Sequence, residues 1–153
     1  MIKKLIAPLA ILVLLVTYFV PITYAEAPKP KLQDQPITQI VTVFAEQNGL
    51  DPKIALSVMQ CESRGIQNNP GDGGKATGIY QYWEDTWERH SKEFGEELDI
   101  NSPYDQAKLA TWAIADGKGR EWTAYRALMN GGKYTFYSSK LKKTITVYCK
   151  KIT

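Results

Sequence analysis

The chain has 153 residues, of which 44% are hydrophobic and 23% are charged, and this is enough material for one domain with an ordinary core. The formal net charge is +3, and two of the lysines lie at the N-terminus, so the remainder is nearly neutral and unlike a nucleic-acid-binding domain. With one histidine, His90, and two cysteines, the chain cannot form a four-cysteine zinc site or a histidine-rich metal centre. We therefore predict no metal site and no nucleic-acid partner, whereas chemistry carried by carboxylates stays open.

The N-terminal segment has the order of a secretory signal, with a positive start, an apolar run and a small-residue cleavage site. Lys3 and Lys4 precede the apolar residues 5–20, and Ala25 occupies the cleavage position. We predict a signal peptide at residues 1–25, with an uncleaved membrane anchor as the alternative. Either way the rest of the chain is exported, to the periplasm or the cell surface, and it contacts a membrane only through this segment if the segment stays attached.

Export also bears on the two cysteines. An even number of cysteines in an oxidising compartment favours a disulfide, and the only possible pair is Cys61 with Cys149. Two buried free thiols are the alternative. In the chain-entropy model, a bridge that closes so long a loop stabilises the fold by about 4–5 kcal/mol.

The Pro- and Lys-rich residues 26–36 predict an extended linker, so we expect the folded domain at residues 37–153. Apolar residues at helical spacing predict a first helix over residues 37–48. Asp51 as N-cap and Pro52 in the first turn predict the start of a second helix.

Residues 64–74 are rich in glycine, asparagine and proline, which predicts an irregular loop. Further helical patterns follow at residues 84–94, 103–115 and 122–129. The C-terminal tail fits two structures, because residues 144–149 alternate like a strand while the apolar positions of residues 141–152 fit a helix. The helical pattern covers more residues, so we predict a sixth helix there, with the strand as the alternative.

Glu62 is the residue that most strongly indicates chemistry. It continues the apolar stripe of the second helix, near the C-terminal end of that helix. Burial disfavours an ionised carboxylate, and the negative end of the helix dipole adds to this effect. Both favour a carboxyl group that keeps its proton near neutral pH, as a general acid for glycosidic bond cleavage requires. The alternative is a surface Glu62 that pairs with Arg64.

The residues that follow the irregular loop have side chains suited to carbohydrate. Gly78 lets the backbone approach a ligand closely, and Gln81 offers both a hydrogen-bond donor and an acceptor. Flat apolar faces for sugar rings could come from Tyr80, Tyr82, Trp83 and Trp87. Core packing is the alternative for these aromatic residues, and we expect it for Trp87.

These residues together resemble a known family. Cys61-Glu62-Ser63, the Gly- and Asn-rich loop and Gly78-Ile79-Tyr80-Gln81 are similar to the Glu-Ser … Gly-Leu-Met-Gln signature of soluble lytic transglycosylases and goose-type lysozymes. The cysteine directly before Glu62 also resembles resuscitation-promoting factors. The resemblance extends over nearly all of the chain that follows the linker.

The resemblance implies a lysozyme-like, mainly α (α+β) domain that cleaves the MurNAc–GlcNAc β-1,4 bond of peptidoglycan. About six helices would surround a central helix that carries the catalytic Glu, and an irregular loop with a short β region would form one wall of the cleft. By position, Glu62 would be the catalytic acid. The substrate-binding residues implied in the same way are Ser63, Gly78, Tyr80, Gln81 and Tyr125.

The match around Tyr125 is partial. The family has an Ala-Tyr-Asn-Ala-Gly stretch whose tyrosine faces the catalytic Glu, and the corresponding residues here are Ala124-Tyr125-Arg126-Ala127-Leu128. Arg126 therefore replaces the asparagine, and Leu128 replaces the glycine.

In a lytic transglycosylase one carboxyl group suffices. Glu62 would protonate the glycosidic oxygen and then accept a proton from the C6 hydroxyl of the same MurNAc, giving a 1,6-anhydro product without metal or cofactor. A hydrolase is one alternative and needs a second carboxylate, for which Asp72 in the Gly-Asp-Gly-Gly loop, also expected to bind substrate, is the candidate. For Asp72 an ordinary turn aspartate is the alternative. A non-catalytic peptidoglycan-binding module is the other. The expected partner is the peptidoglycan glycan strand, bound by a monomer.

Overall fold

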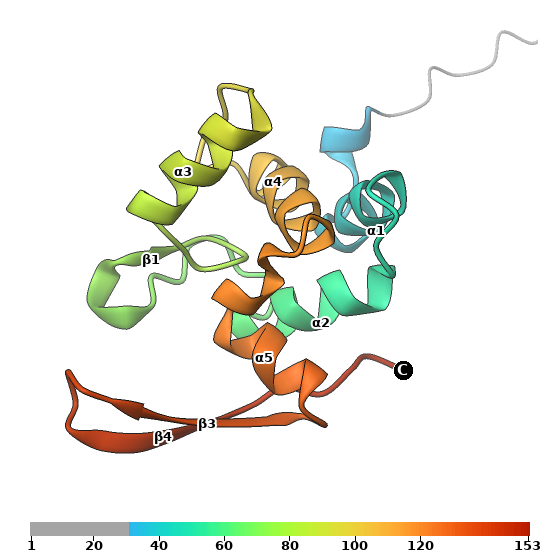
Figure 1. Cartoon of the computed structure of the whole chain (residues 1–153). Coiled ribbons are helices and arrows are strands. Elements are labelled where there is room, and N and C mark those ends of the chain that lie inside the picture. The colour runs from blue at the N-terminus through green and yellow to red at the C-terminus, as the bar shows by residue number, and fades with distance from the viewer. Residues whose placement is uncertain (1–30) are drawn as a thin grey trace, which may run out of the picture.

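The computed structural model describes residues 31–153 (Figure 1), so the predicted signal peptide and residues 26–30 of the predicted linker lie outside the described residues. Within the rest of that linker, a short 3-10 turn, η1 (Leu32–Asp34), precedes the first helix, and Leu32 packs against the core. In this described part, every helix is too short or too polar to span a membrane.

The described residues form a mixed α+β fold with five α-helices and two small antiparallel sheets. The helices are α1 (Ile37–Gln47), α2 (Pro52–Glu62), α3 (Glu84–Phe94), α4 (Pro103–Ala115) and α5 (Thr123–Met129). The strands are β1 (Ala76–Thr77), β2 (Tyr82–Trp83), β3 (Lys133–Ser138) and β4 (Lys143–Tyr148). Two further 3-10 turns are η2 (Asp72–Gly74) and η3 (Lys118–Glu121).

Local signals at the helix starts explain two of the helix boundaries. The side chain of Asp51 accepts a hydrogen bond from the backbone N–H of Lys53 at 2.9 Å, so it caps α2 as predicted. Ser102 caps α4 in the same way and accepts from Asp105 N–H at 3.2 Å. A proline follows each cap at the first helical position, where no backbone donor is needed.

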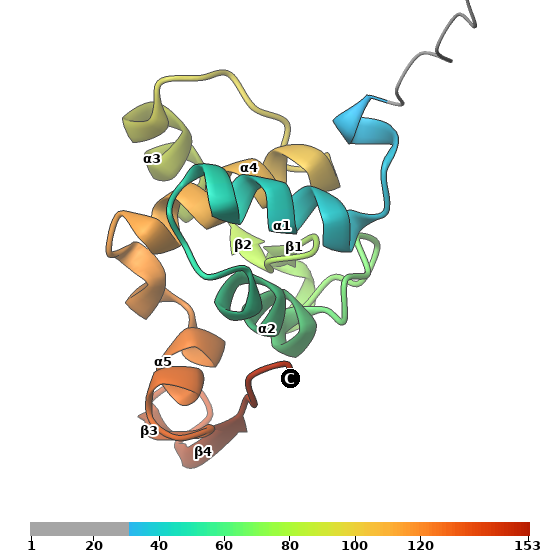
Figure 2. The ribbon, with the colours of Figure 1, turned by 90° about the vertical axis from the view of Figure 1, so that its right-hand side faces the viewer.

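The core lies where α1, α2 and α4 meet (Figure 2), and α5 packs against the far end of α2. The buried apolar side chains of the three central helices are Ile40, Val41, Phe44, Ala45, Ala55, Val58, Met59, Ala107, Leu109, Ala110, Ala113 and Ile114. A second, aromatic part of the core joins the β1–β2 hairpin to α3. Here the ring of Tyr82 makes edge-on contacts with Trp87, His90 and Trp122. This aromatic cluster fixes the hairpin against the helical body.

The prediction of a sixth helix in the tail is wrong, because the tail forms strand β4 of a hairpin with β3. Phe136 pairs with Ile145, and Thr135 pairs with Thr146. The hairpin runs below α5 and projects beyond it (Figure 1). Its inner face carries the half-buried Tyr134, Phe136, Ile145 and Val147. Pairing with residues 133–138 gives hydrogen-bond partners to the backbone groups of this β-branched segment. The sequence pattern of the tail alone cannot show that these partners exist.

The predicted disulfide is present between Cys61 and Cys149, whose Cα atoms lie 5.7 Å apart. It joins the last turn of α2 to the residue after β4, over a sequence separation of 88 residues. Cys149 is buried, and its backbone N–H donates to the carbonyl of Gly132 at 3.0 Å. The bridge therefore ties the hairpin to the helix that carries Glu62, and it is compatible with a location outside the cytoplasm.

We expect reduction of this bridge to lower the melting temperature by about 10 °C or more, because the bridge restricts the unfolded chain over a long loop. Melting with and without a strong reductant, followed by circular dichroism, measures the shift. The Cys61→Ser/Cys149→Ser variant should melt like the reduced protein and stop responding to reductant. Coincident melting curves for the oxidised and reduced protein would contradict the stabilising role of the bridge.

Candidate functional site

Glu62 lies in a cavity of about 410 Å³ that four separate parts of the chain enclose. These parts are the end of α2, the loop of η2 with the β1–β2 hairpin, the first turn of α3, and the junction of η3 with α5. The lining residues are Glu62, Asp72, Ala76, Gln81, Tyr82, Trp83, Thr86, Glu121, Trp122 and Thr123. Of the residues predicted from the sequence, the fold thus brings Glu62, Asp72, Gln81, Tyr82 and Trp83 into one cavity.

The environment of Glu62 favours its protonated form. Glu62 is the last residue of α2, where the free carbonyl groups of the helix disfavour a negative charge. Burial raises the pKa of its carboxyl group from 4.5 to about 7, and a hydrogen bond from the backbone N–H of Ala124 opposes this rise only in part. Within residues 31–153 no ion pair joins Glu62 to Arg64, so the alternative of a surface pair is wrong. At neutral pH a large fraction of Glu62 therefore holds a proton.

Ser63 holds the end of α2 against the β1–β2 hairpin. Its side chain is 2% exposed, and its hydroxyl donates to the carbonyl of Ile79 at 2.7 Å. The same hydroxyl accepts from the backbone N–H of Gly65 at 3.0 Å. Both hydrogen bonds stay inside the protein, so Ser63 positions Glu62 from behind and does not line the cavity.

Gln81 braces the loop that carries Asp72. The backbone of Gln81 is left-handed, with φ of 52°. Its side-chain amide donates to the carbonyls of Asn69 and Gly78, each at 2.8 Å. A Cβ on Gly71 would lie 2.0 Å from Gln81 Oε1, so a side chain at position 71 would displace this amide. Gln81 therefore fixes the shape of the wall opposite Glu62 and also lines the cavity.

Gly78 and Tyr80 do not reach the cavity that contains Glu62. Gly78 has φ of 79°, and a Cβ there would lie 1.8 Å from the side-chain nitrogen of Gln106. The side chain of Tyr80 is fully buried, and its hydroxyl donates to the carbonyl of Ala55 at 3.1 Å. The structure thus gives both residues packing roles, and the substrate contacts predicted for them do not match these positions.

Tyr125 lines a neighbouring cavity, together with Arg120 and Arg126, and does not line the one that contains Glu62. Its ring packs on Gly119, where an added Cβ would lie 2.8 Å from the ring. Tyr125, which was predicted to face the catalytic Glu, therefore faces the neighbouring cavity instead.

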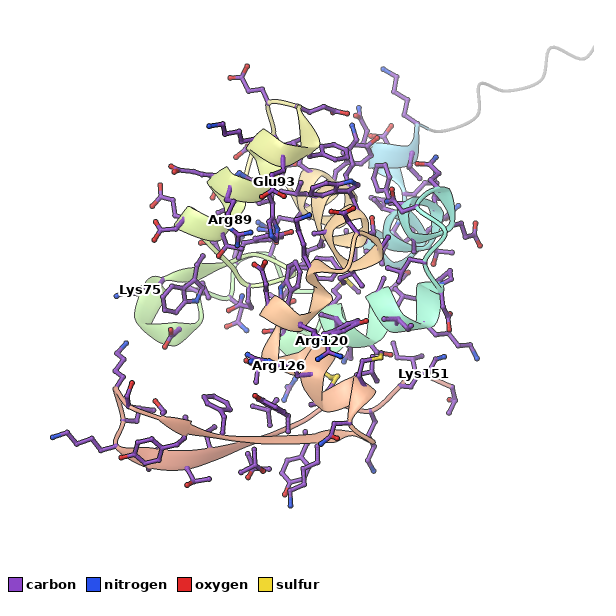
Figure 3. The ribbon with its side chains drawn as sticks, in the orientation of Figure 1. Lys75, Arg89, Glu93, Arg120, Arg126 and Lys151 are labelled. Carbon is purple, nitrogen blue, oxygen red and sulfur yellow. A yellow bond between two sulfur atoms is a disulfide. The ribbon has the colours of Figure 1, made fainter. Side chains whose placement is uncertain are left out.

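Sequence reasoning missed Glu121, which lines the cavity together with Glu62 and Asp72. Arg89 of α3 holds it in a two-pronged ion pair, with Nη2–Oε2 at 2.6 Å and Nη1–Oε1 at 3.2 Å. Hydrogen bonding to Arg89 keeps the pKa of Glu121 below its usual range. The buried His90 Nε2 lies 3.3 Å from the same carboxylate, and burial lowers the pKa of His90. Figure 3 labels Arg89 on the inner side of α3.

Of the three carboxyl-bearing residues that line the cavity, Glu62 and Glu121 have pKa values shifted in opposite directions. Glu62 keeps a proton that it can donate, while Glu121 is held as an anion by Arg89. Environments that separate two carboxyl pKa values in this way are typical of acid–base sites. In the described part of the chain, no group of histidine, cysteine, aspartate and glutamate side chains has the arrangement of a metal site.

Aromatic rings form the apolar part of the lining. Trp83 is 45% exposed and lies at the end of β2, so one side of its indole is accessible to a ligand. Trp122 is buried, and its indole N–H donates to the carbonyl of Tyr80 at 2.8 Å. An accessible ring beside polar groups suits a sugar, which has apolar faces and a rim of hydroxyls.

No protein-family model matches the chain, and no curated protein or solved structure is significantly similar to it. A function for this protein can therefore be inferred only from the geometry and chemistry of the site.

We expect the protein to lose stability relative to a Glu62→Gln variant as the pH rises from 4.5 to 7. In this window the unfolded carboxyl group ionises, while the folded one keeps its proton because its pKa is about 7. The stability difference should grow by up to about 3 kcal/mol and level off above pH 7. Urea unfolding of both proteins at several pH values measures it. A difference that does not vary with pH would mean that Glu62 is not desolvated.

Proposed function

We propose that the protein is a peptidoglycan lytic transglycosylase that cleaves the MurNAc–GlcNAc β-1,4 glycosidic bond. The observation that carries this proposal is the carboxyl group of Glu62, which burial keeps protonated near neutral pH inside a cavity lined by polar and aromatic side chains. The proposed fold is lysozyme-like, in which a Glu at the end of a buried helix faces a wall formed by a short β region. The α2 helix and the β1–β2 hairpin support this arrangement.

In the proposed reaction Glu62 acts first as an acid and then as a base. Its proton goes to the glycosidic oxygen as the bond to C1 of MurNAc breaks and positive charge develops on the sugar ring. The resulting carboxylate takes the proton of the C6 hydroxyl, whose oxygen bonds to C1 and closes the 1,6-anhydro ring. Because the nucleophile belongs to the same sugar, the reaction benefits from high effective molarity. No metal and no cofactor takes part.

The anionic Glu121 supports the same reaction electrostatically. It lines the cavity in a charged state that Arg89 secures, so it can stabilise the positive charge that develops on the sugar ring. Its oxygens are also occupied by Arg89 and faced by His90, which makes it less suited to take a proton from a nucleophile. Glu62 thus remains the acid–base group in this proposal.

A hydrolytic muramidase is the second candidate function, because Asp72 lines the same cavity as Glu62. Asp72 lies on the exposed η2 turn, with φ of 48°, and could activate a water molecule on the opposite wall. A module that binds peptidoglycan without cleaving it is the third. In each case the proposed partner is the glycan strand, and the proposed location is outside the cytoplasm, where the substrate lies.

We expect Glu62→Gln to abolish the release of muropeptides from purified sacculi, because an amide has no proton to donate. The melting temperature should not fall. The matched control is Glu46→Gln, which changes an exposed Glu near the end of α1 and should leave the release unchanged. Full release by Glu62→Gln would refute the mechanism.

The products separate the three candidate functions. Mass spectrometry should find 1,6-anhydro ends for a transglycosylase and reducing ends for a hydrolase, whereas a binding module would sediment with sacculi and release nothing. We expect anhydro ends from the wild type, and from Asp72→Asn at a rate within about tenfold of the wild type, because one carboxyl group suffices. Reducing ends that disappear in Asp72→Asn would favour the hydrolase instead.

A further inference from the structure

A second cavity of about 720 Å³ lies between α5 and the β3–β4 hairpin, and the proposed reaction does not use it. Its lining residues are Arg120, Tyr125, Arg126, Met129, Asn130 and Tyr134. It adjoins the cavity that contains Glu62, because residues 120–126 contribute to both linings. The chain thus has two cavities on the two sides of one short segment.

Two guanidinium groups in this second cavity have no carboxylate partner within residues 31–153. Arg89 differs, since it makes a two-pronged pair with Glu121. Some lysines of the described residues also form ion pairs, as Lys151 does with Asp51. Neither Arg120 nor Arg126 forms an ion pair there. Figure 3 labels both arginines near α5.

Arg126 is held in place, but the hydrogen-bond donors of its guanidinium group are only partly used. Its guanidinium lies over the ring of Tyr134 at 4.8 Å from the ring centre, which fixes its plane. Its hydrogen bonds to the hydroxyls of Tyr134 and Thr123 are long, at 3.4 and 3.5 Å. Its Nε is buried and has no partner in the described part of the chain. A preformed, undersatisfied guanidinium of this kind is suited to a planar anion that accepts two hydrogen bonds.

We infer that this second cavity binds a carboxylate of the peptide stem of peptidoglycan. The inference rests on the proposed function. The stem is attached to MurNAc, the sugar whose bond Glu62 would cleave, so a strand seated at Glu62 brings a peptide rich in carboxylates close to residues 120–126. Arg120 and Arg126 bind the carboxylate, while Tyr125, Tyr134 and the exposed Met129 provide apolar contacts for the short side chains of the stem.

The disulfide ties one wall of this second cavity to α2. Tyr134 belongs to β3, which pairs with β4, and the residue after β4 is bonded to Cys61 next to Glu62. The wall that orients Arg126 is thus covalently tied to the helix that carries the acid. In this proposal the bridge limits how far the stem-binding cavity can move relative to Glu62.

Calorimetric titration of the protein with the free tetrapeptide L-Ala-γ-D-Glu-L-Lys-D-Ala tests this inference without any glycan cleavage. We expect binding, and no binding of the same peptide with both carboxyl groups amidated. Arg120→Gln and Arg126→Gln should each weaken binding about tenfold, because each removes a charge-assisted hydrogen bond. Arg126→Lys should restore little, since lysine keeps the charge but lacks the planar fork. The control Arg64→Gln removes an exposed guanidinium outside this cavity and should bind like the wild type.

Several outcomes would overturn the inference. These are equal binding of the amidated peptide, affinities of the Arg120 and Arg126 variants within twofold of the wild type, or binding of inorganic phosphate without binding of the peptide. Arg120 is exposed, so its variant keeps the test decisive even if Arg126→Gln fails to fold.

A second measurement separates this inference from the proposed function. Strands stripped of their stems by an amidase should be cleaved more slowly than intact strands. Equal cleavage of both, without peptide binding, would refute the inference and leave the proposed function standing. Peptide binding without any cleavage of either strand would refute the proposed function and leave the binding of the stem carboxylate standing.

Discussion

The carboxyl group of Glu62 lies where folding makes its negative charge unfavourable. It is at the negative end of α2, it is largely removed from water, and no cationic side chain of residues 31–153 forms an ion pair with it. A stable protein normally avoids such a position for a glutamate. As a result Glu62 retains a proton, and the proposed reaction needs this proton. The burial that disfavours the carboxylate is therefore also what the proposed reaction depends on.

The structure around Glu62 holds that environment in place. Ser63 fastens the end of α2 to the carbonyl of Ile79, and Gln81 spans the loop that faces the acid. Arg89 pairs with Glu121, so Glu121 stays ionised. The disulfide from Cys61 fixes the hairpin on the other side. None of these contacts touches the proposed reacting bond, yet each limits where Glu62 can lie relative to a sugar bound as proposed.

Sequence reasoning succeeded where the determining signal was local. Asp51-Pro52 and Ser102-Pro103 marked two helix starts, and the cysteine pairing followed because only one pair exists. It failed where the determining contact was distant. The tail became a strand because residues 133–138 pair with it, and a pattern in the tail alone cannot show that. Glu121 was missed since its role depends on Arg89, 32 residues away. Tyr80 was expected in the cleft, but the turn directs its ring into the core.

Titration of the Glu62 carboxyl group by carbon-13 NMR tests the central claim most directly. The protein would be labelled at the glutamate side-chain carboxyl carbon, and the signal of Glu62 would be assigned by its absence from the spectrum of a variant without that carboxyl group. The account predicts a midpoint near pH 7. A midpoint near the ordinary value of 4.5 would show a solvated carboxylate and would contradict the account.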